Sequence, residues 1–151
     1  ITRSDAHGEL TNLRKEFGKD ALYILAWCIQ YDTNGYGAYN YSTTEKDLIN
    51  YHIKFIDGKL QTKKKKNCPK TFIDYAEKWK KPQTRQLLYT EAYVKAGEYF
   101  NFISQREKKY VTMEGTILGN TVDEAVQSLQ KLKFRVDFDN LKASVEAKWK
   151  E

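Results

Sequence analysis

Residues 21–29 read Ala-Leu-Tyr-Ile-Leu-Ala-Trp-Cys-Ile, a run that is apolar on nearly every side of a helix. Apolar residues also occur upstream, at three- and four-residue spacings from Leu10 through Leu13 to Phe17. This periodicity predicts one long helix over about 9–30. A helix that is apolar all round must be covered by other elements, so its second half is predicted to lie at the centre of the core.

Five more stretches show the same helical spacing of apolar residues. Thr71 is predicted to cap the third helix, Thr121 the fifth and Asp139 the last, since these residue types favour the position before a helix. Pro82 is expected to end the third helix. The predicted helices cover about 9–30, 43–56, 71–81, 83–108, 121–133 and 139–150.

These helices predict a mostly α-helical fold, a single-domain bundle of about five to six helices over residues 1–151. Residues 111–117 alternate weakly between apolar and polar types, and 134–138 alternate with period two. A short two-stranded β ribbon that pairs 111–117 with 134–138 is therefore part of the prediction. No apolar run reaches the roughly 18 residues of a transmembrane helix, so we expect no membrane partner.

Charge is the most informative quantity in the composition. The chain has 26 Lys and Arg against 20 Asp and Glu, a net charge of +6. The segment 59–85, called here the basic segment, holds ten basic residues and only two acidic ones. Such a concentration attracts anions. Lysine dominates over arginine, which favours loose contact with a phosphate backbone over the reading of bases.

The basic segment therefore predicts a non-enzymatic protein that binds nucleic acid, DNA or RNA, through its phosphates. The aromatic residues Tyr75 and Trp79 lie within the segment and are candidates for stacking on bases. Their helical spacing with Phe72, however, is more typical of core residues. The candidate phosphate contacts are Lys63, Lys64, Lys65, Lys66, Lys70, Lys80, Lys81 and Arg85.

A second hypothesis comes from tyrosine, of which the chain has eleven. Four tyrosines fall in 31–41, and Tyr36, Tyr39 and Tyr41 are the candidates for contact with a protein partner. Tyrosine suits interfaces because it offers a large area and one polar tip. In this alternative the chain is an accessory or inhibitory subunit of a larger complex, which docks on an acidic protein surface through the loop 31–41 and the basic segment.

The same loop resembles the calcium-binding loop of EF-hands. Asp32, Asn34 and Gly37 match its first, third and sixth positions. The resemblance implies oxygen ligands at Asp32 and Asn34, but Tyr36 and Thr43 stand where two further ligands belong. These departures favour a plain loop between helices, and no cofactor is predicted.

Catalysis has little support in the sequence. The chain has two histidines, and no nucleophile, base and orienting residue occur in a recognisable motif. The acid pairs Asp74 with Glu77 and Asp137 with Asp139 leave a small metal-dependent nuclease as a third hypothesis. Two cysteines exclude a disulfide-rich scaffold and favour an intracellular location.

Overall fold

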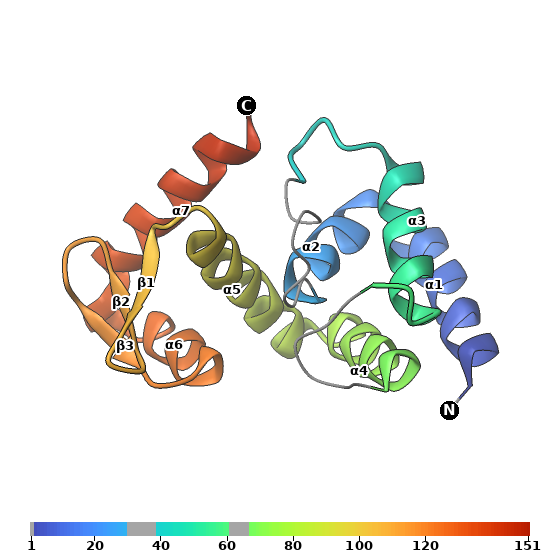
Figure 1. The fold of residues 1–151 in the computed structure, drawn as a ribbon, viewed down its shortest axis with the longest axis horizontal. Helices are drawn as coiled ribbons and strands as arrows, with labels where there is room; N and C mark the ends of the chain where they lie inside the picture. Colours follow the sequence, from blue (N-terminus) through green and yellow to red (C-terminus); the bar gives the residue numbers. More distant parts are fainter. Residues whose placement is uncertain (1, 30–38, 61–66) are drawn as a thin grey trace. The chain divides into compact units, whose positions relative to one another are not determined.

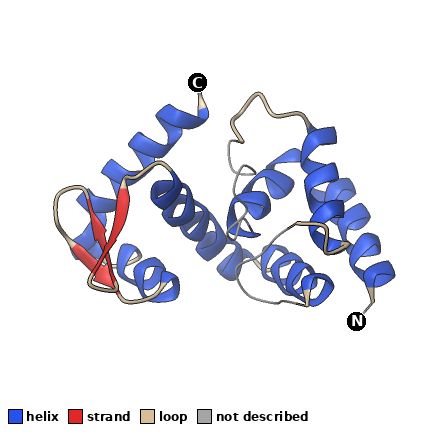
Figure 2. Ribbon diagram, viewed as in Figure 1, coloured by secondary structure: helices blue, strands red, loops and turns tan. Residues whose placement is uncertain are grey.

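A computed structural model describes residues 2–29, 39–60 and 67–151, and these residues form seven α-helices, one 3-10 turn and a small antiparallel sheet (Figures 1 and 2). The prediction of a mostly α-helical fold with a short β element is confirmed. The chain divides into two compact units, Ile1–Leu88 and Tyr89–Glu151. The single-domain organisation stays a prediction.

The first unit consists of α1 (Arg3–Phe17), α2 (Lys19–Ile29), α3 (Glu45–Ile56), α4 (Cys68–Lys80) and the start of α5 (Pro82–Tyr99). Helix α2 contacts α1, α3 and α4, and all its residues from Ala21 to Ile29 are buried. The prediction that 21–29 forms the centre of a core is therefore confirmed. The largest enclosed side chains of this core are Trp27, Phe55 and Phe72.

The predicted helix over 9–30 is two helices that meet at Gly18. Gly18 has a φ of 73°, a conformation that glycine adopts without steric cost. Its N–H donates to the carbonyl of Arg14 at 2.9 Å and so closes the last turn of α1. The apolar periodicity continues across this break, which is why it predicted a single helix.

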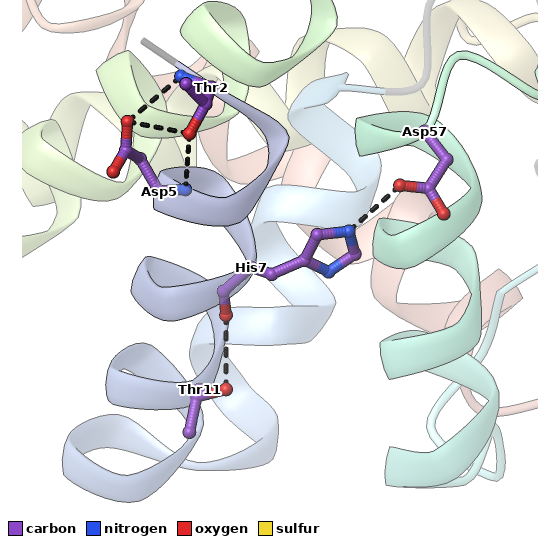
Figure 3. Close-up of polar contacts among 5 residues, drawn as sticks. All are labelled: Thr2, Asp5, His7, Thr11 and Asp57. Carbon is purple, nitrogen blue, oxygen red and sulfur yellow. Dashed lines mark hydrogen bonds and ion pairs between the residues drawn. The ribbon is translucent and has the colours of Figure 1, made fainter.

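The N-terminus of α1 is fixed by side chains (Figure 3). The Thr2 hydroxyl accepts from the Asp5 N–H at 3.1 Å, and the Asp5 carboxylate accepts from the Thr2 N–H at 3.0 Å, which together form a capping box. One turn later, His7 Nε2 lies 2.9 Å from the carboxylate of Asp57, which follows α3. This hydrogen bond lowers the pKa of Asp57 and ties α1 to the end of α3.

Helix α4 begins earlier than predicted. Asn67 caps it by accepting from the N–H of Lys70 at 3.1 Å, and Pro69 occupies its first turn. Thr71, the predicted cap, lies inside the helix. Cys68 is buried, so the apolar face begins one turn before the first residue of the predicted helix.

The second unit contains the rest of α5, the strands β1 (Ile103–Arg106), β2 (Lys109–Thr112) and β3 (Ile117–Gly119), and α6 (Val122–Leu129), η1 (Leu132–Phe134) and α7 (Arg135–Trp149). The prediction that α5 runs to residue 108 is wrong. Asn101 has a φ of 65°, and the Phe102 N–H donates to the Gly97 carbonyl at 2.7 Å. This left-handed residue ends the helix and directs the chain into β1.

The sheet has the order β1-β2-β3, with both pairs antiparallel. Arg106 pairs with Lys109, so only Glu107 and Lys108 connect β1 to β2. Both have positive φ, 51° and 65°, which is the conformation of a tight hairpin turn whose twist matches that of the strands. Residues 111–117 are thus extended in part, as predicted, but they fold back on each other.

The predicted pairing of 111–117 with 134–138 is wrong, because 134–138 is helical. The residues that follow 138 explain the error. The side chains of Leu141, Val145 and Trp149 are buried at four-residue intervals, which is a helical period. Phe134 and Phe138 are half-buried on the same side of the helix. Consequently α7 begins at Arg135, before the predicted cap Asp139. Thr121 does cap α6, accepting from the Glu124 N–H at 3.1 Å.

Gly119 provides a first test of the second unit. Its φ is 144°, and a Cβ at this position would lie 2.6 Å from Cβ of Glu124 in α6. Gly119→Ala is therefore expected to lower the free energy of unfolding by about 2 kcal/mol, through backbone strain and the contact together. Denaturant titration measures the loss.

Gly115→Ala is the matched control for Gly119→Ala. Gly115 also has a positive φ, 89°, but open space surrounds its missing Cβ. Its replacement should cost about 1 kcal/mol, from strain alone. Equal losses in the two variants would show that the close approach of Gly119 to α6 has no energetic effect.

Candidate nucleic-acid interface

The two units differ sharply in charge. The first, Ile1–Leu88, has 16 basic and 10 acidic residues, whereas the second has 10 of each. The whole net charge of +6 therefore belongs to the first unit, which contains the basic segment 59–85. The first unit as a whole therefore attracts anions more strongly than the second, which is neutral in sum.

Lys63, Lys64, Lys65 and Lys66 lie outside the described residues, while the other predicted phosphate contacts lie within them. Two of the latter are engaged with the protein's own carboxylates. Lys70 Nζ lies 2.8 Å from the Asp74 carboxylate, which raises the pKa of Lys70. Lys80 Nζ lies 2.6 Å from the carboxylate of Glu9 on α1. Both lysines thus stabilise the fold in addition to carrying charge.

Arg85 and Trp79 contact each other. The Trp79 side chain is only 2% exposed, and its ring meets the edge of Phe17 at a centroid distance of 6.1 Å. The Arg85 guanidinium lies over the rings of Phe17 and Trp79, and its Nε donates to the Trp79 carbonyl at 2.6 Å. The prediction that Trp79 stacks on bases is therefore wrong, because the ring is part of the core.

The exposed face of α4 is mixed in charge. Lys70, Asp74, Glu77 and Lys81 follow one another at three- and four-residue steps, which places them on the same side of the helix. Both acids of the basic segment thus lie among its lysines. Lys78, on the neighbouring side, places its ammonium 5.5 Å from the centre of the half-buried Tyr75 ring. The candidate stacking role of Tyr75 stays a prediction.

The structure leaves three cations of the basic segment well placed for an external anion. Among the described residues, Lys59, Lys78 and Lys81 are exposed and form no ion pair with a carboxylate. Lys59 and Lys78 were not among the predicted contacts. Lys59 has no acidic residue four positions away, whereas Lys78 follows Asp74 by four positions, so spacing relative to acids identifies Lys59 and not Lys78.

The tyrosines of 31–41 are described only in part. Tyr36 lies outside the described residues, as do Asp32 and Asn34 of the EF-hand-like loop. The Tyr39 ring packs against Tyr51 of α3 at 5.3 Å, and Tyr41 lies 5.8 Å from Tyr23 of α2 with 46% of its surface exposed. Tyr39 and Tyr41 thus cover the helices of the first unit, and their predicted contact with a partner stays a prediction.

Three of the four carboxylates named for a nuclease have a polar neighbour of their own. Asp74 pairs with Lys70, Asp137 accepts from the Thr116 hydroxyl at 2.9 Å, and Asp139 lies 3.9 Å from Lys142. Within the described ranges, no three His, Cys, Asp or Glu side chains gather closely enough to hold a metal ion.

In the part of the chain that the structure describes, no helix has both the length and the apolar character needed to cross a bilayer. Comparison of the chain with known proteins finds no matching family model, no matching curated protein and no matching solved structure.

Proposed function

We propose that the protein binds nucleic acid through the phosphate backbone, with the basic segment 59–85 of the first unit as its contact surface. The observation that carries the proposal is the distribution of charge: one unit holds the entire net charge of +6, and the other is neutral. Polyanions bind such a surface because each neutralised phosphate releases condensed counterions.

The described side chains favour backbone contact over base reading. Trp79, the residue best suited to stacking, is in the core, and the half-buried Arg85, the residue best suited to bidentate hydrogen bonds, lies over its ring and donates to its carbonyl. The exposed cations Lys59, Lys78 and Lys81 are point charges on flexible stems, which suit phosphates of any sequence. Binding is therefore expected to show little sequence selectivity and a steep dependence on salt.

Lys70 and Lys80 can also bind phosphate, although each forms an ion pair with a carboxylate of the protein. Exposed ion pairs are typically worth between 0 and about 1 kcal/mol, so a phosphate can compete for these ammonium groups. Lys70 is the more accessible of the two, with 57% of its side chain exposed against 36% for Lys80. Lys70 is the better candidate, since its carboxylate partner is also half-exposed to water.

The test compares charge removal on the two units. Lys78→Gln combined with Lys81→Gln is expected to lower affinity for duplex DNA about tenfold in dilute salt and to reduce the slope of log K against log salt by about 2. Lys63–Lys66→Gln should reduce the slope further. The matched control is Lys142→Gln with Lys148→Gln, which removes the same charge from the second unit and should leave the slope unchanged.

Fluorescence anisotropy with labelled duplex DNA and single-stranded RNA provides the measurement. If neither nucleic acid binds in dilute salt, the proposal fails. It also fails if the control pair lowers affinity as much as the α4 pair, since the effect would then reflect overall charge. Binding to polyglutamate but not to DNA or RNA would favour docking on an acidic protein instead.

A further inference from the structure

Residues 131–136, Lys-Leu-Lys-Phe-Arg-Val, are the most exposed mixture of apolar and cationic side chains among the described residues. The segment forms η1 and the first residues of α7. Leu132 is 80% exposed and Val136 is 72% exposed, the highest values for large apolar residues that the structure describes. Apolar side chains this exposed in a folded unit indicate a surface that meets something else.

The three cations of this segment are available to an external partner. Lys131, Lys133 and Arg135 are exposed, and none forms an ion pair with a carboxylate within the described ranges. Lys133 extends past the half-buried ring of Phe134, 5.1 Å from its centre. The second unit is neutral as a whole, so this segment is a local positive site on it.

The turn between β2 and β3 adds to the same surface. Two hydrogen bonds hold it against α7: Thr116 to Asp137 at 2.9 Å and Asn140 to Glu114 at 3.2 Å. Val136 lies next to Asp137 and one helical turn before Asn140, so it flanks this turn. Met113, in the turn, is 67% exposed. Met113 therefore adds a third exposed apolar side chain near the N-terminal part of α7.

A small cavity lies between the turn and α7, next to Met113. The cavity lined by Met113, Asp137 and Asn140 has a volume of about 20 Å³, enough for a water molecule but not for an apolar side chain. Peptide partners bind tightly when an anchor residue fills a pocket, which this cavity does not provide. A second copy of the chain would bring the same three cations face to face, and like charges disfavour that contact.

We propose that residues 131–136, with Met113, bind peripherally to an anionic lipid surface. The exposed apolar side chains of Leu132 and Val136 enter the boundary between headgroups and acyl chains, while Lys131, Lys133 and Arg135 meet the anionic headgroups. Nucleic acid fits less well, because phosphates gain nothing from exposed Leu and Val. The sequence-based expectation of no membrane partner rested on the lack of a spanning helix, which a peripheral contact does not need.

The first experiment measures co-sedimentation of the full chain with phosphatidylcholine vesicles that contain about 30 mol % phosphatidylserine. Each cation near such a surface is worth about 1 kcal/mol, so Lys131→Gln, Lys133→Gln and Arg135→Gln together should weaken binding roughly 100-fold. Leu132→Ser with Val136→Ser should weaken it roughly tenfold. The matched control, Lys142→Gln with Lys148→Gln and Lys150→Gln, removes the same charge from the C-terminal end of the second unit and should change binding less than about threefold.

A second readout separates this surface from the lysines of the first unit, which attract anionic vesicles by charge alone. Leu132→Cys, labelled with an environment-sensitive fluorophore, should shift to shorter wavelength on anionic vesicles and not on pure phosphatidylcholine. Cys28 and Cys68 are buried, so the label is directed to the new thiol. Ser104→Cys on β1 is exposed and serves as the control that should not shift.

Three results would overturn the proposal. They are an unchanged emission at position 132, an equal loss of binding in the glutamine triplet and its control, or full retention of binding in the Leu132 and Val136 variant. If the glutamine triplet weakens binding to duplex DNA and not to vesicles, the segment belongs to a nucleic-acid interface instead. The Lys78 and Lys81 variants leave this segment intact, so the two proposals fail independently.

Discussion

Trp79→Ala is expected to lower the free energy of unfolding of the first unit by about 3–5 kcal/mol, the usual cost of removing a fully enclosed aromatic side chain. The ring is 2% exposed and contacts Phe17 edge-on at 6.1 Å. Its loss leaves a cavity between α1 and α4 and removes the surface on which the Arg85 guanidinium lies, 5.3 Å away. Denaturant titration of the full chain provides the measurement.

The same substitution separates a core role from a binding role. Trp79→Phe keeps an aromatic edge against Phe17 and should retain most of the stability, with unchanged affinity for DNA. If Trp79 were a stacking residue, Trp79→Ala would weaken DNA binding without unfolding the unit. An unfolding free energy that changes by less than about 0.5 kcal/mol in Trp79→Ala, the level typical of surface positions, would contradict the core placement.

Acid is expected to destabilise the first unit through His52. This residue of α3 is fully buried, its Nε2–H donates to the Leu22 carbonyl at 2.9 Å, and its ring meets the edge of Phe72. Burial lowers the pKa of His52 to about 4, which keeps the imidazole neutral. Its Nδ1 has no hydrogen-bond partner among the described residues, so nothing compensates a charge on the ring.

The direction of the pH effect follows from the two protonation states. The unfolded chain takes up a proton near pH 6.5, whereas the folded unit resists it until about pH 4. Stability is therefore fully present above 6.5 and declines as the pH falls, by about 3 kcal/mol near pH 4. Unfolding titrations at closely spaced pH values measure this slope.

His52→Leu removes the titrating group and should flatten the decline between pH 6.5 and 4. His7→Gln is the matched control, because it leaves the buried imidazole in place and should retain the loss that His52 causes. The His7–Asp57 contact, by contrast, involves a carboxylate whose pKa the hydrogen bond from His7 holds below its ordinary value, so its loss acts at lower pH. An identical acid slope in the wild type and His52→Leu would show that His52 does not control it.

Most of the helices were predictable because their apolar stripes are local. Residues 21–29 are buried as their composition indicates, and Thr121 caps α6 as its side chain favours. The boundaries were harder, because they depend on single residues. Gly18 and Asn101 adopt left-handed conformations that end α1 and α5, but neither interrupts the apolar pattern. The spacing of apolar residues therefore predicted helices that were too long.

The sheet and the site depend on contacts between distant residues, which periodicity does not reveal. The alternation within 134–138 is compatible with a strand when the segment is taken alone. The segment is helical in the structure because α7 packs against the core through Leu141 and Trp149. The concentration of charge in 59–85 was predictable from counting. That Lys80 pairs with Glu9, 71 positions away, was not, because it depends on how α1 packs against α4.

The two-residue connection at Glu107 and Lys108 restricts how this sheet can change in evolution. Side chains alternate between the two faces of a strand, so one added residue would move Ile103, now buried, to the water side. Insertions or deletions within the strands of this hairpin are thus tolerable only in even numbers, and the bend at 113–116 is restricted as well, because its hydrogen bonds to Asp137 and Asn140 fix it against α7. A single-residue insertion or deletion within β1 or β2 is therefore expected to destabilise the second unit.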